Sequence, residues 1–449
     1  MIILDADEIS RVALLHLADG TATSLEDAGR LLGARQLSLH PSPGIIMTAA
    51  GQAAILTTAV TAVRTFGAVY VTLPEDTRVS DGVHRGRLLS DALREEGAQL
   101  VEGPTAPGAT VIVLGSGGRH VPSTSGGIAL HASWDGWIAT VSPTPRSAPV
   151  EEGNVLAAIA AAALAVSEAF AHARSISGSD AGYRTLQVNL LGPDSGSGPD
   201  LRYAPASWWL VGLGHLGQAY GWVISHLPFD CPAAVEVTLQ DTDLTSPANY
   251  STSVLTPQNS RGVPKTRMVA DRLEGAGLRT RIIERPLDET FGLRADETHI
   301  VALIGVDNLP TRRTLSAIGW PLTIDMGLGQ QAHDHTAISM HRFPGSKHSH
   351  EILAWQDQPQ TERAIPATPG FDDLDRRFDR CGVVTLAGKA IGVPFVGTIA
   401  ACLAVTEALK QLHGLPGSVV AGIDLSTGHH MSAPAPRHNR IAPVSLRPE

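Results

Sequence analysis

Short apolar runs alternate with longer segments of helical patterning along the 449-residue chain. The stretch "LVGLGHLGQAYGW" at 210–222 predicts a short strand that runs into a GxGxxG turn and then into a helix. Two further apolar runs follow, "AVEVTLQDT" at 234–242 and "HIVALIGVDN" at 299–308. Buried strands that alternate with helices predict an α/β unit with a largely parallel sheet.

The same order of elements occurs earlier in the chain. Apolar runs at 68–76 and from 110 match the two later runs, and "LAVSEAF" at 164–170 matches "LAVTEAL" at 403–409. An Ala-Gly-Ala set has the spacing of the later glycines: Ala49, Gly51 and Ala54 against Gly212, Gly214 and Gly217. We therefore predict two tandem Rossmann-like, doubly wound units. The first is degenerate, because an alanine adds a Cβ where the backbone must approach a phosphate.

Composition and spacing predict the domain boundaries. The second copy is longer than the first, which indicates an insertion, and the residues between the copies are rich in glycine, serine and proline. We predict a degenerate unit at 1–185 and a linker at 186–204. A nucleotide-binding unit follows at 205–430, with the insertion at about 329–393, and a Pro-rich tail at 431–449.

Charge and cysteine content exclude several classes of protein. The formal net charge is -10, and no basic run offers the clustered cations that nucleic-acid phosphates need. The N-terminus has no basic segment followed by an apolar one, and the longest apolar stretch, 155–166, ends at Ser167 and Glu168, short of a bilayer span. We expect a cytoplasmic protein without nucleic-acid or membrane partners. The three cysteines form no CxxC pair, which disfavours a disulfide framework and an all-cysteine zinc site.

The glycine motif alone leaves the ligand open. It predicts only a helix N-terminus that is free to receive an anion. In a nicotinamide site an acid on the ribose follows about 20 residues later, and Asp241 lies slightly farther than that from Gly217. An NAD(P)-dependent oxidoreductase is therefore one alternative. It leaves Lys265, Asp307 and the degenerate repeat unexplained.

Three further segments follow the glycines: "DTDLTSPANY" from 241, "RGVPKTRMVADRL" from 261 and "VALIGVDNLPTRRTL" from 301. The series resembles the ubiquitin-activating-enzyme superfamily, the ThiF, MoeB and HesA group. Its pattern is GxGxxG, a DxD with an Asn eight residues after the first Asp, a GxxK element, and a DN followed by TR. The resemblance runs from about 205 to 415 and continues into the first half as a degenerate copy.

The resemblance implies ATP- and Mg²⁺-dependent adenylation of a carboxylate on a ubiquitin-like carrier, a peptide or a small acid. By position, the glycines would approach the triphosphate, Asp241 would hold the ribose, Asn249 and Lys265 would contact phosphates, and Asp307 would coordinate Mg²⁺. Attack of a carboxylate on the α-phosphate brings two anions together, so the site needs cations and hydrogen-bond donors that offset their charge. The alternatives are a solvated lysine at a helix start for Lys265 and a helix N-cap for Asp307.

One position departs from the family pattern. Thr252 stands where the family has an arginine on the phosphates, and a hydroxyl cannot replace a guanidinium. Arg261, Arg267 or Arg11 could supply that charge, the last from the position of the family's N-terminal arginine. Without such a cation the chain would be an inactive ThiF-like binding or scaffold protein. Whether it pairs as a homodimer is left open.

The segment 379–412 resembles the family's closing segment, a Cys-Gly stretch that leads into a crossing helix. By that resemblance Cys381 would be a nucleophile for onward transfer, and the neighbouring Arg377 and Arg380 would favour its thiolate form. The alternatives are a small packed residue before a helix, or direct transfer without a cysteine. Cys402, in an Ala-rich helix, is expected in the core.

The insertion is rich in histidine. Its five histidines are His333, His335, His341, His348 and His350. Alternation along a strand could place His333 and His335 on one face, as in a metal site. A solvated loop is the alternative, and the two CxxC pairs of the family's zinc site are absent from the sequence.

Overall fold

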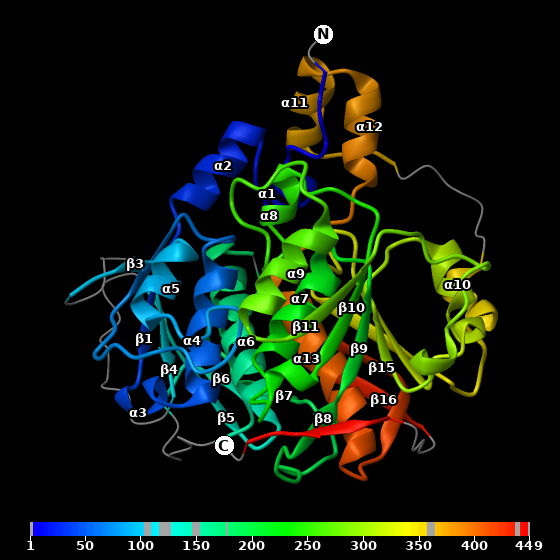
Figure 1. The fold of residues 1–449 in the computed structure, drawn as a ribbon. Coiled ribbons are helices and arrows are strands. Elements are labelled where there is room, and N and C mark those ends of the chain that lie inside the picture. The colour runs from blue at the N-terminus through cyan, green and yellow to red at the C-terminus, as the bar shows by residue number, and fades with distance from the viewer. Residues whose placement is uncertain are drawn as a thin grey trace.

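A computed structural model describes residues 3–102, 109–115, 127–145, 153–176, 178–356, 364–435 and 441–447. Two β-sheets flank a central group of helices (Figure 1). The first sheet has the strand order β3-β2-β1-β4-β5-β6-β7. Its strands are β1 (Gln36–Pro41), β2 (Ala68–Val71), β3 (Gln99–Leu100), β4 (Thr110–Leu114), β5 (Ala129–Asp135), β6 (Ile138–Ser142) and β7 (Leu186–Asn189).

The second sheet has the order β11-β10-β9-β12-β13-β14-β15-β16. Its strands are β9 (Ser207–Val211), β10 (Glu236–Gln240), β11 (Arg279–Ile283), β12 (Val301–Ile304), β13 (Leu322–Leu328), β14 (Ala337–Phe343), β15 (Gly417–Asp424) and β16 (His429–Ala435). In both sheets the first five strands in this order are parallel and the remaining ones antiparallel. The predicted α/β class with parallel sheets is therefore confirmed.

Helices connect the parallel strands, as expected for crossovers that must cover a sheet. The first half contains α1 (Arg11–Ala18), α2 (Leu25–Gly33), α3 (Pro43–Ile46), α4 (Ala49–Ala62), α5 (Leu89–Glu95) and α6 (Val155–Ala173). The second contains α7 (His215–Ser225), α8 (Pro247–Tyr250), α9 (Lys265–Gly275), α10 (Leu309–Ile318), α11 (Pro369–Arg377), α12 (Arg380–Gly388) and α13 (Pro394–Leu412).

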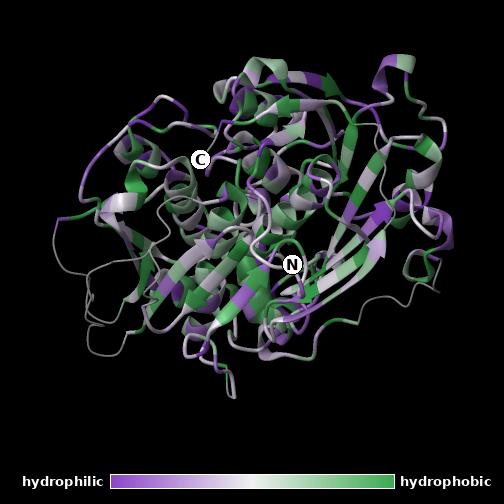
Figure 2. Ribbon diagram, turned by 90° about the horizontal axis from the view of Figure 1, so that it is seen from below, coloured by the Kyte–Doolittle hydropathy of each residue, from purple (hydrophilic) through white to green (hydrophobic). Residues whose placement is uncertain are grey.

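Two long apolar helices, α6 and α13, pack against each other between the sheets. Phe170 on α6 meets Phe395 on α13 with ring centroids 5.6 Å apart. Both helices are long and apolar enough to span a membrane, but 89% and 83% of their apolar windows are buried inside the protein, as in the core of a soluble protein. In Figure 2 hydrophobic residues are spread over the strands and helices of the interior. Helix α6 includes Ser167 and Glu168, as the match of "LAVSEAF" to "LAVTEAL" predicts.

The charge of Glu168 is tolerated in that apolar helix because it is paired. Its carboxylate lies 2.7 Å from the guanidinium of Arg184 and is 2% exposed. A buried carboxylate that keeps a bidentate guanidinium partner avoids most of the cost of an isolated buried charge. The helix therefore continues to Ala173 with this charge inside it.

Two predicted boundary segments are wrong in part. Residues 186–189, placed in the linker, form β7, which pairs with β6 and buries Leu186 and Val188. Residues 431–435, placed in the tail, belong to β16, and β17 (Pro443–Ser445) pairs with β8 (Tyr203–Pro205). Residues 436–440 and 448–449 of the predicted tail lie outside the described residues.

Candidate functional site

The glycine loop lies between β9 and α7, where three backbone segments touch. Gly212 has a φ of 80°, which favours glycine. A Cβ on Gly217 would lie 1.8 Å from the Gly212 carbonyl oxygen, and a Cβ on Gly305 would lie 3.0 Å from the Gly217 nitrogen. The N-cap residue Gly214 offers no side chain to the first amides of α7. The geometry fits an anion at this helix N-terminus.

The first half keeps one of these glycines but not the loop. Gly51 is the third residue of α4, as Gly217 is of α7, and a Cβ there would lie 2.0 Å from the Ile45 carbonyl oxygen. The predicted match of Ala49, Gly51 and Ala54 to Gly212, Gly214 and Gly217 is therefore wrong by three residues. Helix α3 stands in place of the open turn, and its Ile45 and Ile46 are fully buried. Apolar side chains thus fill the place that an anion would need.

Asp241, Asp243 and Lys265 form a connected group beside the glycine loop. The Leu213 amide donates to Asp241 Oδ2 at 2.5 Å, and the Asp243 amide donates to Asp241 Oδ1 at 2.7 Å. Lys265 Nζ donates to Asp243 Oδ2 at 2.8 Å. The Lys265 side chain is only 9% exposed, so the alternative of a solvated lysine is wrong.

Asn249 lies in α8 and Thr252 directly after it, and their side chains have different roles in packing. Asn249 Oδ1 accepts from the amide of Ser246 at 2.7 Å and completes a capping box. Thr252 is 6% exposed. A Cβ on Gly392 would lie 3.1 Å both from Thr252 Cγ2 and from His215 Nδ1. Position 252 is therefore closed in by the segment that precedes α13.

The structure separates the three arginines considered as substitutes for the missing cation. Arg11 donates its amide to Ser251 Oγ at 3.0 Å and its guanidinium to the Ala6 carbonyl at 3.0 Å, and burial lowers its pKa. Arg261 pairs with Glu8 at 2.6 Å. Arg11 thus lies in the N-terminal segment and Arg261 contacts it through Glu8. A hydrogen bond from the Ala248 amide to the Asp7 carbonyl joins this segment to α8. Arg267 instead pairs with Glu284.

Asp307 lies in the loop after β12, two residues beyond Gly305. Its neighbour Asn308 is the N-cap of α10 and accepts from the Thr311 amide at 2.8 Å, so the helix cap predicted as the alternative falls on Asn308. Asp307 is exposed, and its carboxylate forms no hydrogen bond or ion pair with any described residue. An unengaged carboxylate of this kind suits a hard divalent cation.

A buried pair behind the Asp307 loop was missed by the sequence analysis. Arg312 donates to the carbonyls of Val306 at 3.1 Å and Met326 at 2.9 Å and lies 3.3 Å from Asp325. Asp325 is fully buried, and desolvation raises its pKa to about 7 although Arg312 opposes the shift. The sequence feature that could have indicated this pair is the single acid inside the apolar strand "LTIDMGL". The pair holds the β12–α10 loop against β13.

Cys381 is the exposed second residue of α12. Its helix is capped by Asp379, which accepts from the amides of Gly382 at 2.7 Å and Leu4 at 2.8 Å. The two arginines expected to favour its thiolate are already paired, Arg377 with Glu26 and Asp373, and Arg380 with Asp375. Figure 1 places α12 at the end of the molecule where the N-terminal segment and α8 lie. Among the described residues no hydrogen bond or ion pair joins Cys381 to the glycine loop.

The remaining cysteines and histidines form no metal centre in the described part of the chain. Cys402 is fully buried, which raises the pKa of its thiol, and Cys231 is exposed. His333 and His335 lie in a turn before β14, so the prediction that they share a strand face is wrong. The His335 ring contacts Arg174 at 3.3 Å, and burial lowers its pKa to about 4.

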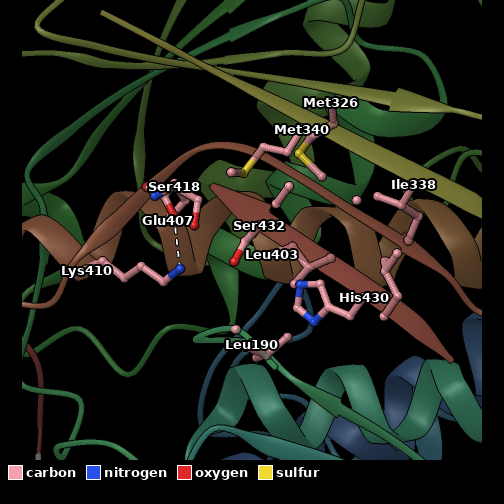
Figure 3. Close-up of a pocket in the computed structure, with 14 residues that line it drawn as sticks. Leu190, Met326, Ile338, Met340, Leu403, Glu407, Lys410, Ser418, His430 and Ser432 are labelled. Carbon is pink, nitrogen blue, oxygen red and sulfur yellow. Dashed lines mark hydrogen bonds and ion pairs between the residues drawn. The ribbon is translucent and has the colours of Figure 1, made fainter. Parts of the chain in front are cut away.

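A small cavity lies apart from the glycine loop, between α13 and the strands β13 to β16 (Figure 3). Its volume is about 20 Å³, enough for one water molecule. Glu407 and Lys410 form its charged side, 3.1 Å apart, and Met326 and Met340 its apolar side. Glu407 also pairs with the buried Arg342 at 3.0 Å. The group of Glu407, Lys410 and Arg342 is the structural counterpart, in the second half, of the Glu168–Arg184 pair.

Two protein-family models match the chain. The model described as the BilD C-terminal domain covers residues 204–415, and the model described as the BilD N-terminal domain covers 36–190. The bacterial E1-like protein BilD of Collimonas sp. (strain OK412) is 34% identical over 430 residues, which span 92% of this chain and 90% of that protein.

Similar solved structures include those of E. coli MccB. The structure with ATP is 14% identical with a TM-score of 0.34, covering 53% of this chain and 65% of that one. The structure with MccA-N7isoASN is 14% identical with a TM-score of 0.35, covering 53% and 66%. This chain therefore matches slightly less than two thirds of the length of MccB.

Proposed function

Because the chain belongs to the family of bacterial E1-like BilD proteins, we propose that it adenylates a carboxylate with ATP and releases pyrophosphate. The predicted resemblance to the E1-like superfamily is confirmed by these matches. The adenylation reaction, its Mg²⁺ ion and its substrate are the proposal. The acid would be the C-terminus of a ubiquitin-like carrier, a peptide or a small molecule.

The observation that carries the proposal is the contact between the glycine loop and the group of Asp241, Asp243 and Lys265. The glycines leave a helix N-terminus open, and a buried lysine is connected to the loop amide of Leu213 through Asp243 and then Asp241. Gly305, which touches Gly217, lies two residues before Asp307 in the chain. Donors and a cation fixed around one anion site are what charge development on phosphates requires.

Each predicted residue has a proposed task there. Gly212, Gly214 and Gly217 would cradle the triphosphate, Asp241 would meet the ribose, Asn249 and Lys265 would donate to phosphates, and Asp307 would hold Mg²⁺, which neutralises phosphate charge. In the reaction an oxygen of the substrate carboxylate bonds to the α-phosphorus. The bond from the α-phosphorus to the oxygen that bridges to the β-phosphorus breaks, and pyrophosphate leaves with both electrons.

We propose further that the two halves are tandem Rossmann-like units and that the first has lost its nucleotide site. The common strand order of the two sheets and the shared position of Gly51 and Gly217 support a duplication. The buried Ile45 and Ile46 at the first loop support the loss. The cytoplasmic location and the homodimer remain predictions.

We expect ATP with Mg²⁺ to raise the melting temperature of the protein. A ligand at about 100 times its dissociation constant stabilises the native state by about 2.7 kcal/mol. Differential scanning fluorimetry with ATP–Mg²⁺, NAD(H) and NADP(H) measures the effect. A shift with the nicotinamide nucleotides alone would mean an oxidoreductase, and no shift with any nucleotide would mean a scaffold protein.

For onward transfer we propose Cys381 as the acceptor. Its sulfur would attack the acyl carbon of the adenylate, forming a thioester while AMP leaves. The thiol is exposed and sits in the first turn of α12, where the helix dipole favours negative charge. Direct transfer to another nucleophile is the alternative.

We expect iodoacetamide to label Cys381 faster than either other cysteine near neutral pH. Cys402 is buried and should react last. Cys231 is exposed without lying in a helix turn of this kind, so it controls for exposure alone. Peptide mass spectrometry over a time course measures the three rates. Equal rates at Cys381 and Cys231, together with full turnover by Cys381→Ala, would contradict the thiol route.

A further inference from the structure

We infer that the first half positions the glycine loop of the second half through a buried chain of hydrogen bonds that runs from Arg64 through Gln218 to Leu213. The inference rests on the proposed nucleotide site. It assigns a task to the half that has no such site of its own.

Arg64 follows α4 in the first half, and its side chain is 1% exposed. Its guanidinium donates to the carbonyls of Val254 and Thr256 in the second half, each at 3.1 Å, and to its own helix at Val60. The guanidinium also lies over the Tyr250 ring, 4.5 Å from its centroid. One arginine thus holds the segment 250–256, which carries Thr252 and directly follows Asn249.

The charge of Arg64 is balanced within the first half. Glu96 lies 3.8 Å from its guanidinium, and His84 Nε2 contacts the same carboxylate at 2.9 Å. All three side chains are at most 7% exposed. A buried arginine with a fixed carboxylate keeps its planar fork in one orientation, which suits the binding of two carbonyls.

Gln218, on α7, connects that segment to the glycine loop. Its Oε1 accepts from the Leu255 amide at 3.1 Å and from Thr256 Oγ1 at 3.0 Å. Its Nε2 donates to the Leu213 carbonyl at 3.0 Å. The other side of Leu213, its amide, donates to Asp241. A shift of segment 250–256 would therefore move the loop residue that lies between Gly212 and Gly214.

The contact is more specific than general packing between the halves. Every polar atom of the Gln218 amide is used, and Gln218 is fully buried. A second hydrogen bond, from Trp222 Nε1 to Thr57 Oγ1 at 3.0 Å, joins α7 to α4 beside it. Buried networks of this kind hold one geometry because each broken bond leaves an unpaired polar group. Arg64 and Gln218 are thus positioning residues for the loop.

Arg64→Lys and Thr256→Val test the chain of contacts. Lysine keeps the charge but cannot donate to both carbonyls in the planar geometry of a guanidinium, and valine removes the hydroxyl that donates to Gln218. We expect each to raise KM for ATP about five- to tenfold in pyrophosphate exchange, the factor for one hydrogen bond, with a smaller change in kcat. The double variant should lose less than the product of the two effects, because both act through one chain.

Arg184→Lys is the matched control. Arg184 is also a first-half arginine that pairs with a buried glutamate and donates to carbonyls of the second half, at Leu425 and Ser426. It lies at the β15–β16 turn, away from the glycine loop. The Arg184→Lys variant should have a lower melting temperature than the wild type but an unchanged KM for ATP. An equal rise in KM for Arg184→Lys would show that Arg64 acts only through stability and would overturn the inference.

Hydrogen–deuterium exchange on the ATP-free protein separates the inference from the proposed function. Arg64→Lys should increase exchange at least threefold in peptides that cover 212–218 and 253–257, and Arg184→Lys should not. Unchanged exchange in these peptides would overturn the inference even if the protein uses ATP. If wild-type protein shows no pyrophosphate exchange while the peptides respond as expected, adenylation is wrong and the positioning of the loop stands.

Discussion

Lys265→Ala and Asp307→Ala should each reduce the exchange of labelled pyrophosphate into ATP by at least about a hundredfold, the effect of removing one fixed charge-stabilising group from a transition state. Lys265 is the buried cation linked to the glycine loop through Asp243 and Asp241, and Asp307 is the exposed, unengaged carboxylate in the loop after β12. Folding should be nearly unaffected, because the partner that Lys265 leaves behind, Asp243, is 66% exposed.

Two exposed residues serve as controls for charge removal. Lys347→Ala removes a lysine and Asp296→Ala an aspartate from surface positions of the same half, and both should keep wild-type exchange. Circular dichroism confirms that all four variants are folded. Wild-type exchange in Lys265→Ala would refute the assignment of the phosphate site, and wild-type exchange in Asp307→Ala would refute that of the metal ligand.

Gly217→Ala should abolish the thermal shift with ATP–Mg²⁺ and lower the free energy of unfolding by about 1–3 kcal/mol, as overpacking does. The added Cβ would lie 1.8 Å from the Gly212 carbonyl oxygen, so the loop backbone must move. Scanning fluorimetry with and without nucleotide measures both effects.

Gly51→Ala separates stability from nucleotide binding. Its Cβ would lie 2.0 Å from the Ile45 carbonyl oxygen, a comparable clash in the first half. We expect a similar loss of stability but a retained shift with ATP–Mg²⁺. Gly214→Ala, whose Cβ meets nothing within 4 Å, should leave stability near wild type. A nucleotide shift that survives in Gly217→Ala would place the phosphates elsewhere.

The sequence predicted what is local. Apolar runs that end in a glycine turn mark β9 and α7, and the position of Lys265 at the start of α9 follows from motif spacing. The alignment of the first half with the second could not be predicted in the same way. Helix α4 is buried on nearly all sides, so its alanines show no polar-apolar pattern that would indicate which residue matches which. Spacing alone then aligned Ala54 with Gly217, whereas the clash at Ile45 identifies Gly51.

The contacts of Arg64, Arg312 and Gln218 were not predictable for a different reason. Arg64 joins the two halves, and Arg312 and Gln218 join separate elements of the second half, so these contacts exist only in the folded structure. A lone arginine at a helix end is usually solvated. The strands β7 and β17 were missed because they are short, and β16 was missed because histidines, serine and proline interrupt its apolar pattern. Cys381 was expected in a stretch before a helix, whereas it lies in α12, a short helix of its own that the sequence pattern did not reveal. The pairing of Arg377 and Arg380 with carboxylates depends on folding.

The packing of α6 against α13 constrains the order in which the protein can be made. Helix α6 ends at Ala173 and α13 begins at Pro394, so about 220 residues leave the ribosome between them, which takes roughly 10 to 45 s at 5–20 residues per second. During that interval the side of α6 that receives Phe395 has no cover. The nascent first half must therefore remain folded on its packing of α4 and α6 until the last eighth of the chain is synthesised.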